Sequence, residues 1–476
     1  RQRPVLLMGP PGVGKTQIME QIAAETGVGL VAYTITHHTR QSAIGLPFIE
    51  KRTYGGEEVS VTEYTMSEIL SSVYRLMERT GLQEGILFLD EINCVSETLA
   101  PMMLQFLQCK TFGNQALPEG WLIVAAGNPP EYNKSVRDFD VVTLDRVKRI
   151  DVEEDYGVWK EYARRKNLHG AILSYLDIKK DNFYRIENTA DGLQFATARG
   201  WEDLSELLYA YETLGIRADR EVVGQYIQMP RIAKDFANYL EMFYKYQKTY
   251  HVEGILSGTW ENITVLELRE APFDEKLSVM GLVLSRLSEE ARNTRCQDAL
   301  TDALHTSLTE FREKIADAPP LTVLDQLLWK RRTAMKQAKE AGQLDKESRD
   351  LKQREINALE DYRQRLDREA VAPEGAMDAV RGWFGEEVER RKAVAMETKD
   401  MFDNAFRFLE TTFGDSQELV IFVTEITAGY DTSWFVEQFG CDAYFRHNRE
   451  LLFDSTRHRI REEIAAAKAA EQEENT

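Results

Sequence analysis

The sequence lacks the residues that several kinds of site and location would require. Only four cysteines occur among 476 residues, and none belongs to a Cys-x-x-Cys pair. This number and spacing predict neither a disulfide framework nor a zinc site, and four free thiols suit the reducing cytoplasm. No apolar run approaches the roughly 20 residues that a membrane-spanning helix needs, so we expect a cytoplasmic protein without a membrane span.

Positive charge is also in short supply. The chain carries 59 lysines and arginines against 79 aspartates and glutamates, which gives a formal net charge of −20. Because non-specific binding to nucleic acid depends on neutralising phosphates with basic side chains, this balance argues against a nucleic-acid partner. Hydrophobic residues make up 43% of the chain, enough for sizeable cores, and the length predicts two to four domains.

The most informative stretch is a glycine-rich loop near the start of the chain. A short apolar run ends at Met8, and the pattern Gly-x-x-x-x-Gly-Lys-Thr then leads into a predicted helix. The backbone of such a loop curls round a polyphosphate, and side chains at Gly12 and Gly14 would obstruct that approach. We expect Lys15 to reach the β- and γ-phosphates of ATP and the Thr16 hydroxyl to ligate Mg²⁺. The residues predicted to contact the nucleotide are Gly9, Pro10, Pro11, Gly12, Val13, Gly14, Lys15, Thr16 and Gln17.

A second motif follows about 75 residues after this loop. Four apolar residues, Ile86 to Leu89, are followed directly by Asp90 and Glu91. This pattern predicts a buried strand with two carboxylates at its carboxyl end, where ligands bind in open α/β sheets. Asp90 is predicted to join Thr16 in holding Mg²⁺, and Glu91 to orient or activate the attacking water.

Other signals lie on either side of this strand. Two β-prone runs joined by Gly55-Gly56 predict a hairpin over residues 45–64, either a protruding element that touches a substrate or an irregular surface loop. A second small hairpin is predicted at residues 111–120. Asn128 follows the predicted strand 121–126, where it could hydrogen-bond the attacking water or the γ-phosphate, or simply form a turn before Pro129.

In this order, the motifs resemble those of the AAA+ superfamily. The shared features are the phosphate-binding loop, the inserted hairpin, the strand ending in Asp90-Glu91, the small hairpin, the turn at Asn128 and the Leu-Asp-Arg segment at Arg146. The chain most resembles the MoxR family of the helix-2-insert branch, over about residues 1–250. The resemblance implies an α/β core with a parallel five-stranded sheet at residues 1–152, an α-helical lid at residues 153–252, and a homo-oligomeric ring, expected to be a hexamer.

The resemblance also implies roles for polar residues outside the two main motifs. Asn128 would be sensor 1, and Arg146 would be the arginine finger that acts on ATP bound to the neighbouring subunit. Fingers of this kind contribute ~10³–10⁵-fold in rate. The family more often has Phe after this arginine, whereas this chain has Val147, so Arg149 and Arg137 are alternatives. From the residues alone, Arg146 could also form a surface salt bridge.

Arg199 is the candidate contributed by the lid. Thr197 is a suitable N-cap, which places Arg199 in the first turn of the helix that follows. A cation is unfavourable there because of the helix dipole, so a role outside the helix is expected. The resemblance makes Arg199 sensor 2, which reaches the γ-phosphate, although Ala198 stands where the family usually has Pro. The alternative is an exposed residue of the helix cap.

Residues 253–476 carry no chemical motif and are predicted to be mostly α-helical. Residues 263–268 are predicted to form a short strand, and residues 321–370 a long helical hairpin that could serve as an arm. The apolar run at residues 419–423 predicts a buried helix, and residues 465–476 a frayed tail. At the other end, the chain enters its first strand soon after Arg1, so we expect a further N-terminal segment to precede it.

Together these features predict an ATPase with the cofactors ATP and Mg²⁺. The leading hypothesis is a ring that couples ATP hydrolysis to remodelling, assembly or activation of a protein client. The MoxR resemblance adds a partner with a von Willebrand factor A domain. The alternatives are an ATP-gated structural adaptor with little turnover and, against the charge of −20, a DNA-directed motor.

Overall fold

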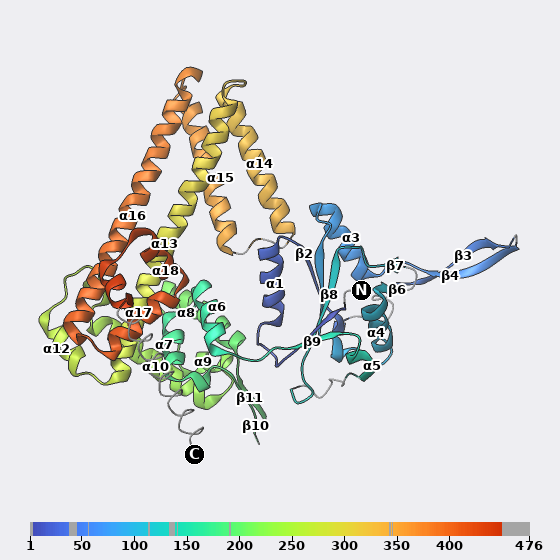
Figure 1. Ribbon diagram of the computed structural model, residues 1–476, viewed down its shortest axis with the longest axis horizontal. Helices are drawn as coiled ribbons and strands as arrows, with labels where there is room; N and C mark the ends of the chain where they lie inside the picture. The colour runs from blue at the N-terminus through green and yellow to red at the C-terminus, as the bar shows by residue number, and fades with distance from the viewer. Residues whose placement is uncertain are drawn as a thin grey trace, which may run out of the picture. The chain divides into compact units, whose positions relative to one another are not determined.

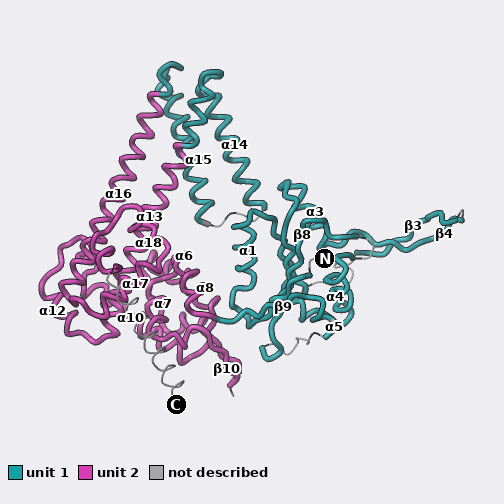
Figure 2. The backbone as a smooth tube through the Cα atoms, in the orientation of Figure 1, with its two compact units in different colours: residues 1–154, 306–377 teal, residues 155–305, 378–476 magenta. Residues whose placement is uncertain are grey.

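The computed structural model describes residues 3–37, 45–55, 57–112, 115–132, 139, 141–189, 192–341, 344 and 346–449. The chain divides into two compact units (Figure 2), residues 1–154 with 306–377, and residues 155–305 with 378–476. All four cysteines are free thiols. Within the described residues, no helix is both long and apolar enough to cross a membrane.

The N-terminal part of the first unit is built on a parallel five-stranded sheet (Figure 1), as predicted. The strands, in the order β2-β5-β8-β1-β9 across the sheet, are β1 (Val5–Met8), β2 (Gly29–Thr34), β5 (Gly85–Asp90), β8 (Trp121–Gly127) and β9 (Lys148–Asp151). β1 lies between β8 and β9, with Met8 level with Gly127 and Asp151. The strand that precedes the glycine-rich loop is therefore flanked by the strands that precede Asn128 and the lid.

Helices cover both faces of this sheet. They are α1 (Lys15–Thr26), α3 (Glu68–Thr80), α4 (Ala100–Cys109) and α5 (Val141–Leu144), with the short helices η1 (Ile35–His37) and η2 (Ile92–Cys94). Successive residues of a strand point to opposite faces. Leu7 and Phe88 thus pack with Met19 of α1, whereas Leu6 and Leu87 belong to the core under α3 and α4. Burial on both faces explains why β5 reads as a continuous apolar run.

Two antiparallel hairpins extend this core, and both were predicted. β3 (Pro47–Tyr54) pairs with β4 (Glu57–Tyr64), and β6 (Thr111–Phe112) pairs with β7 (Gln115–Ala116). Nearly every side chain of the β3–β4 hairpin is exposed, including Ile49, which is 76% exposed. A two-stranded ribbon with so little packing is only marginally stable by itself.

The first unit also contains a helical hairpin, which confirms the hairpin predicted for residues 321–370. α14 (Pro320–Glu340) and α15 (Lys346–Arg368) run antiparallel. Buried Leu324, Leu327 and Leu359 form part of their apolar seam. The guanidinium of Arg331 reaches the buried carboxylate of Glu355 across the pair at 2.9 Å. The hairpin is thus held by a narrow apolar seam and by ion pairs rather than by a broad core.

The second unit is mostly helical. Its elements are α6 (Tyr156–Arg165), α7 (Gly170–Ile178), η3 (Lys180–Asn182), β10 (Arg185–Thr189), β11 (Gly192–Ala196), α8 (Ala198–Leu214), α9 (Arg220–Tyr226), α10 (Pro230–Thr249), α11 (Val252–Leu256), α12 (Asn262–Glu270), most of α13 (Phe273–Lys314) and of α16 (Ala376–Phe413), α17 (Gln417–Ala428) and α18 (Tyr430–Phe439). The short helix η4 (Pro373–Gly375) belongs to the first unit. α17 confirms the buried helix predicted around residues 419–423, since Leu419, Phe422 and Val423 are all buried.

Two predictions for this unit are wrong. Residues 263–268 form helix α12, not a strand, and Val265 and Leu268 are buried three positions apart while Leu266 is exposed. Spacing of three residues is the helical period, and the β-branched composition concealed it. Residues 153–252, predicted to be a helical lid, also contain the β10–β11 hairpin, whose strands are only five residues long and carry no clear alternation.

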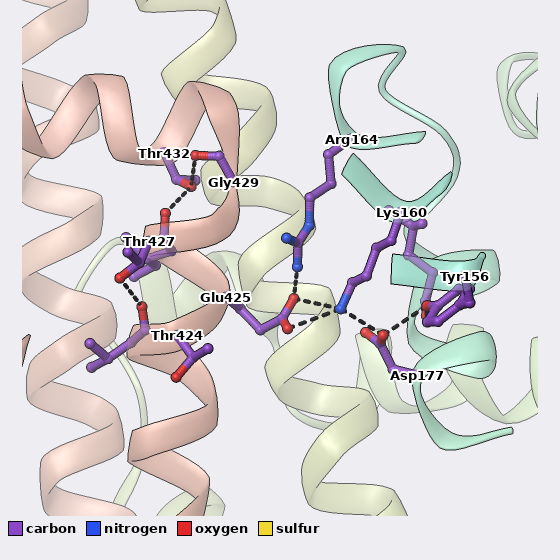
Figure 3. Close-up of polar contacts among 12 residues, drawn as sticks. Tyr156, Lys160, Arg164, Asp177, Thr424, Glu425, Thr427, Gly429 and Thr432 are labelled. Atoms are coloured by element: carbon purple, nitrogen blue, oxygen red, sulfur yellow. Dashed lines mark hydrogen bonds and ion pairs between the residues drawn. The ribbon is translucent and has the colours of Figure 1, made fainter. Parts of the chain in front are cut away.

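Segments far apart in the sequence share one core in this unit. Trp201 of α8 and Phe236 of α10 belong to the same buried cluster as Phe402 of α16 and Phe435 of α18. A charged network (Figure 3) adds to this core. Its members are Tyr156, Lys160, Arg164, Asp177 and Glu425.

The network joins α6 and α7 to α17 through two carboxylates. Glu425 accepts from Lys160 at 2.9 Å and also pairs with Arg164, while Asp177 pairs with Lys160 at 2.6 Å. Tyr156 donates to Asp177 at 2.7 Å. Burial lowers the pKa of Lys160 to about 8, although the Asp177 carboxylate opposes the shift. The cations are therefore held by their partners against the cost of burial.

Candidate nucleotide-binding site

The glycine-rich loop joins the carboxyl end of β1 to the start of α1. Gly12 and Gly14 have φ values of 76° and 91°, in the left-handed region that favours glycine. Gly9 is required for a different reason, because a Cβ atom there would lie 2.3 Å from the backbone oxygen of Val152 in the segment after β9. The sequence analysis explained the glycines only by the space that a phosphate needs. It missed the left-handed backbone at Gly12 and Gly14 and the close approach of Val152 to Gly9.

The start of α1 is suited to an anion. Lys15, Thr16 and Gln17 form its first turn, and no side chain in the described part of the chain caps it. The free N–H groups and the helix dipole at such a terminus favour negative charge. The predicted loop residues Gly9 to Gly14 lead directly into this turn, so the structure supplies the strand, loop and helix that the motif requires.

Lys15 is held at the loop by several acceptors. Its side chain is almost completely buried, and the ammonium donates to the backbone oxygens of Gly9 at 2.8 Å and Pro10 at 2.9 Å. It also donates to Oδ1 of Asn128 at 2.8 Å. Two residues that were singled out from separate motifs are therefore in direct contact, because β1 and β8 are neighbouring strands.

The two predicted magnesium ligands also lie together. The Thr16 hydroxyl donates to Oδ2 of Asp90 at 3.4 Å. Both groups offer oxygen ligands, which Mg²⁺ prefers, and a Mg²⁺ ion shared with phosphates needs only one or two protein ligands. Burial raises the pKa of the nearby Cys94 thiol, and the Glu91 and Asp90 carboxylates raise it further. Because Thr16 and Asp90 offer oxygen ligands of the kind that Mg²⁺ prefers, the residues present fit a magnesium ion.

Glu91 has an unusual backbone conformation and a fixed side chain. Its φ is 56°, which is uncommon for a residue with a side chain and occurs mostly at functional sites and turns. Its Oε2 accepts a hydrogen bond from the hydroxyl of Thr36 at 3.1 Å. Thr36 lies in η1, directly after β2, and β2 pairs with β5 so that Thr34 is level with Asp90. Sequence reasoning missed Thr36 because its closeness to Glu91 depends on the strand order.

Asn93 is a second residue that sequence reasoning missed. It lies in η2, two residues after Glu91, and it is 3% exposed. Its Nδ2 donates to the backbone oxygen of Asn128 at 2.8 Å. The only signal in the sequence was its position two residues after the Asp90-Glu91 pair.

Within the described part of the chain, the candidate arginines show no hydrogen bond or ion pair with these site residues. Arg146 is exposed in the turn after α5, and within the described residues its side chain forms no ion pair or hydrogen bond. Arg149 lies on β9 and pairs with Asp151 at 2.8 Å. Arg137 lies outside the described residues. Arg199 is exposed in the first turn of α8, in the second unit, where Thr197 caps the helix as predicted.

The structure thus brings five predicted residues to one edge of the sheet. Lys15, Thr16, Asp90, Glu91 and Asn128 lie at the carboxyl ends of β1, β5 and β8 or in the turns that follow them. This is the edge where open α/β sheets bind their ligands. The arrangement can hold a polyphosphate and a cation, and it places a carboxylate beside them.

Comparisons with known proteins agree with this fold. Residues 4–147 match the family model described as AAA domain (dynein-related subfamily). The matched segment, a little under a third of the chain, contains every candidate residue of the first unit except the alternative finger Arg149, and it ends before the second unit begins. The N-terminal domain is therefore an AAA+ ATPase domain.

Similar solved structures were also found, at low overall similarity. A RuvB mutant from Thermotoga maritima is 12% identical over 52% of this chain and 56% of that chain, with a TM-score of 0.24. The AAA domain of FIGL-1 in complex with ADP is 15% identical over 52% of this chain and 78% of that chain, with a TM-score of 0.27. The chain thus matches little more than half the length of the RuvB protein, and the assignment rests on the family model. No curated protein sequence matches the chain.

Proposed function

We propose that this chain, whose residues 4–147 are an AAA+ domain, is a ring-forming ATPase that remodels, assembles or activates a protein client. AAA+ domains in general bind and hydrolyse nucleotide, which makes ATP the natural ligand of the loop at Lys15. The observation that carries the proposal is the contact of Lys15 with Asn128 at 2.8 Å, beside the pair of Thr16 and Asp90. These groups meet at one edge although they lie at the ends of three different strands or in the segments that follow them.

Each residue has a chemical task in this proposal. The Lys15 ammonium exchanges its backbone acceptors for the β- and γ-phosphate oxygens of ATP. Thr16 and Asp90 would hold Mg²⁺, which would neutralise the charge that develops on the phosphates. Glu91 orients and activates the attacking water, and Asn128 donates its amide to that water or to the γ-phosphate.

The ring is proposed from the arginines. Arg146 is exposed and carries no ion pair within the described residues, so its guanidinium is available to ATP of a neighbouring subunit. Arg149 is tied to Asp151 and would have to break that pair first. Arg199 is proposed as the lid arginine that reaches the γ-phosphate of its own subunit. A hexamer remains the proposal that follows from the family resemblance.

The client side of the proposal rests on the β3–β4 hairpin and on the resemblance to MoxR proteins. Exposed apolar residues such as Ile49 and Phe48 lie on a ribbon with little packing of its own, which suits contact with another protein. Motion of the lid would change the position of a bound client. A partner with a von Willebrand factor A domain is proposed from the resemblance alone.

The test compares Glu91→Gln with Glu84→Gln in steady-state ATP hydrolysis and in ATP binding. Glu84 is exposed just before β5, at the opposite end of the strand, so its variant is a matched control. We expect Glu91→Gln to bind ATP but to lose turnover, and Glu84→Gln to behave as the unmodified chain. Equal turnover in both variants would overturn the role of Glu91. Binding without turnover in the unmodified chain would favour an ATP-gated adaptor.

The ring is tested separately through protein concentration. A site completed by a neighbouring subunit predicts specific activity that rises as the chain oligomerises. Arg146→Ala should then abolish this activity, whereas Arg149→Ala should retain it. The reverse result would move the finger to Arg149, and activity independent of concentration would contradict a shared site.

A further inference from the structure

A buried amide connects the strand of catalytic carboxylates to the phosphate-binding loop. Asn93 donates from Nδ2 to the backbone oxygen of Asn128 at 2.8 Å. The side chain of Asn128 in turn accepts from the Lys15 ammonium at 2.8 Å. No hydrogen bond of the described residues joins Asn93 directly to Lys15 or to the loop, so Asn128 is the link between them.

The surroundings of Asn93 are shaped to hold this amide. A Cβ atom at Gly127 would lie 2.7 Å from Oδ1 of Asn93, so the last residue of β8 leaves room for the side chain. The orientation of the amide is also determined, since the opposite orientation would set Oδ1 against the Asn128 oxygen. The Asn93 side chain, on the short helix η2, thus packs against the end of β8 at Gly127 and hydrogen-bonds the turn at Asn128.

The amide is nevertheless only half satisfied. Oδ1 of Asn93 is buried and has no hydrogen-bond partner among the described residues. Burying such an acceptor costs free energy that an apolar side chain of the same shape would not. Packing alone therefore does not explain why this residue is an asparagine. The hydrogen bond that its Nδ2 donates to the Asn128 oxygen does explain it.

We propose that Asn93 is a positioning residue for ATP hydrolysis. By holding the backbone oxygen of Asn128, it keeps the Asn128 side chain on the Lys15 ammonium and aims both groups at the γ-phosphate. A bond of this kind fixes a polar group before the reaction starts, which is how preorganised sites lower the barrier. The inference rests on the proposed ATPase function.

The first test is Asn93→Leu, which removes the donor and the orphan acceptor together and keeps a similar shape. A packing role predicts unchanged turnover, because replacing a half-satisfied amide by an apolar group is close to neutral for folding. A positioning role predicts that kcat falls about tenfold while KM for ATP and the melting temperature change little. Asn404→Leu is the control, because Asn404 also donates its amide to a backbone oxygen at 2.8 Å, in the second unit.

Asn93→Asp is the second variant, in case Asn93→Leu fails to fold. An ionised Asp cannot donate to the Asn128 oxygen, whereas a protonated one can. Burial and the carboxylates of Asp90 and Glu91 favour the protonated form, and Lys15 opposes it. We expect kcat of Asn93→Asp, relative to the unmodified chain, to rise as the pH is lowered from about 8 to about 6. A constant ratio across this range would overturn the proposal.

A readout without nucleotide separates this inference from the ATPase proposal. The rate of amine modification of Lys15, measured by mass spectrometry with Lys160 as internal reference, reports how firmly its ammonium is held. We expect several-fold faster modification in Asn93→Leu than in the unmodified chain and in Asn404→Leu. Equal rates together with equal kcat overturn the inference. Faster modification in a chain that never hydrolyses ATP would overturn the ATPase function and support the positioning contact.

Discussion

Glu425 offers a direct test of how α6 is joined to α17. Its carboxylate faces both Lys160 and Arg164, whose side chains are 12% and 15% exposed. Glu425→Gln keeps the shape and removes the charge, so that two largely buried cations lose their shared partner. Lys160 retains Asp177, but Arg164 has no other ion pair within the described residues.

The size of the effect follows from this geometry. Breaking a buried ion pair by removing one partner costs about 3–5 kcal/mol. Glu425 is 23% exposed, and Lys160 keeps one carboxylate, so we expect a cost at or below the lower limit of that range, about 2–3 kcal/mol. For a unit of this size each kcal/mol lowers the melting temperature by roughly 2–4 °C, which predicts a loss of about 5–10 °C.

The assay is thermal unfolding by circular dichroism, with hydrogen exchange of peptides from α6 and α17 to locate the change. Glu437→Gln on α18 is the control, because Glu437 is exposed. A double-mutant cycle with Arg164→Met should give a coupling free energy of about 1–3 kcal/mol between Arg164 and Glu425. A melting temperature unchanged in Glu425→Gln, or a coupling free energy near zero, would refute the reasoning.

Three further predictions concern single contacts. Thr36→Val removes the hydrogen bond that orients Glu91, so we expect kcat to fall several-fold with unchanged ATP affinity in a nucleotide-binding titration; unchanged kcat would contradict the role of that bond. Gly9→Ala places a Cβ atom 2.3 Å from the Val152 oxygen, so we expect a loss of about 1–3 kcal/mol in urea unfolding and weaker ATP binding. Because burial lowers the pKa of Lys160 to about 8, the unfolded chain binds this proton more readily, so Lys160 makes the free energy of unfolding rise with pH between about 8 and 10. Lys160→Met should lose this rise in urea titrations at several pH values, and an unchanged slope would argue against the buried amine.

Local patterns were enough to predict much of the first unit. Four elements could be predicted from contiguous runs of sequence, because the composition and spacing of each run favour one local structure. They are the loop at Lys15, the strand that ends at Asp90 and the two hairpins. The parallel five-stranded sheet was implied by the resemblance of the ordered motifs to the AAA+ superfamily, and the α14–α15 hairpin followed from apolar periodicity. Local patterns failed at residues 263–268, where β-branched residues occupy a helix, and at the short β10–β11 hairpin.

By itself the sequence determined the nucleotide-binding chemistry of this protein, since that chemistry needs particular residue types at short, regular spacing. Only the tertiary structure decided that Asn128 contacts Lys15, that Thr36 holds Glu91, and that Asn93 holds Asn128. These contacts join residues that are far apart along the chain, and they depend on the order of the strands. The apolar pattern of a strand shows that it is buried but does not specify its neighbours, so such contacts become visible only when the sheet is assembled.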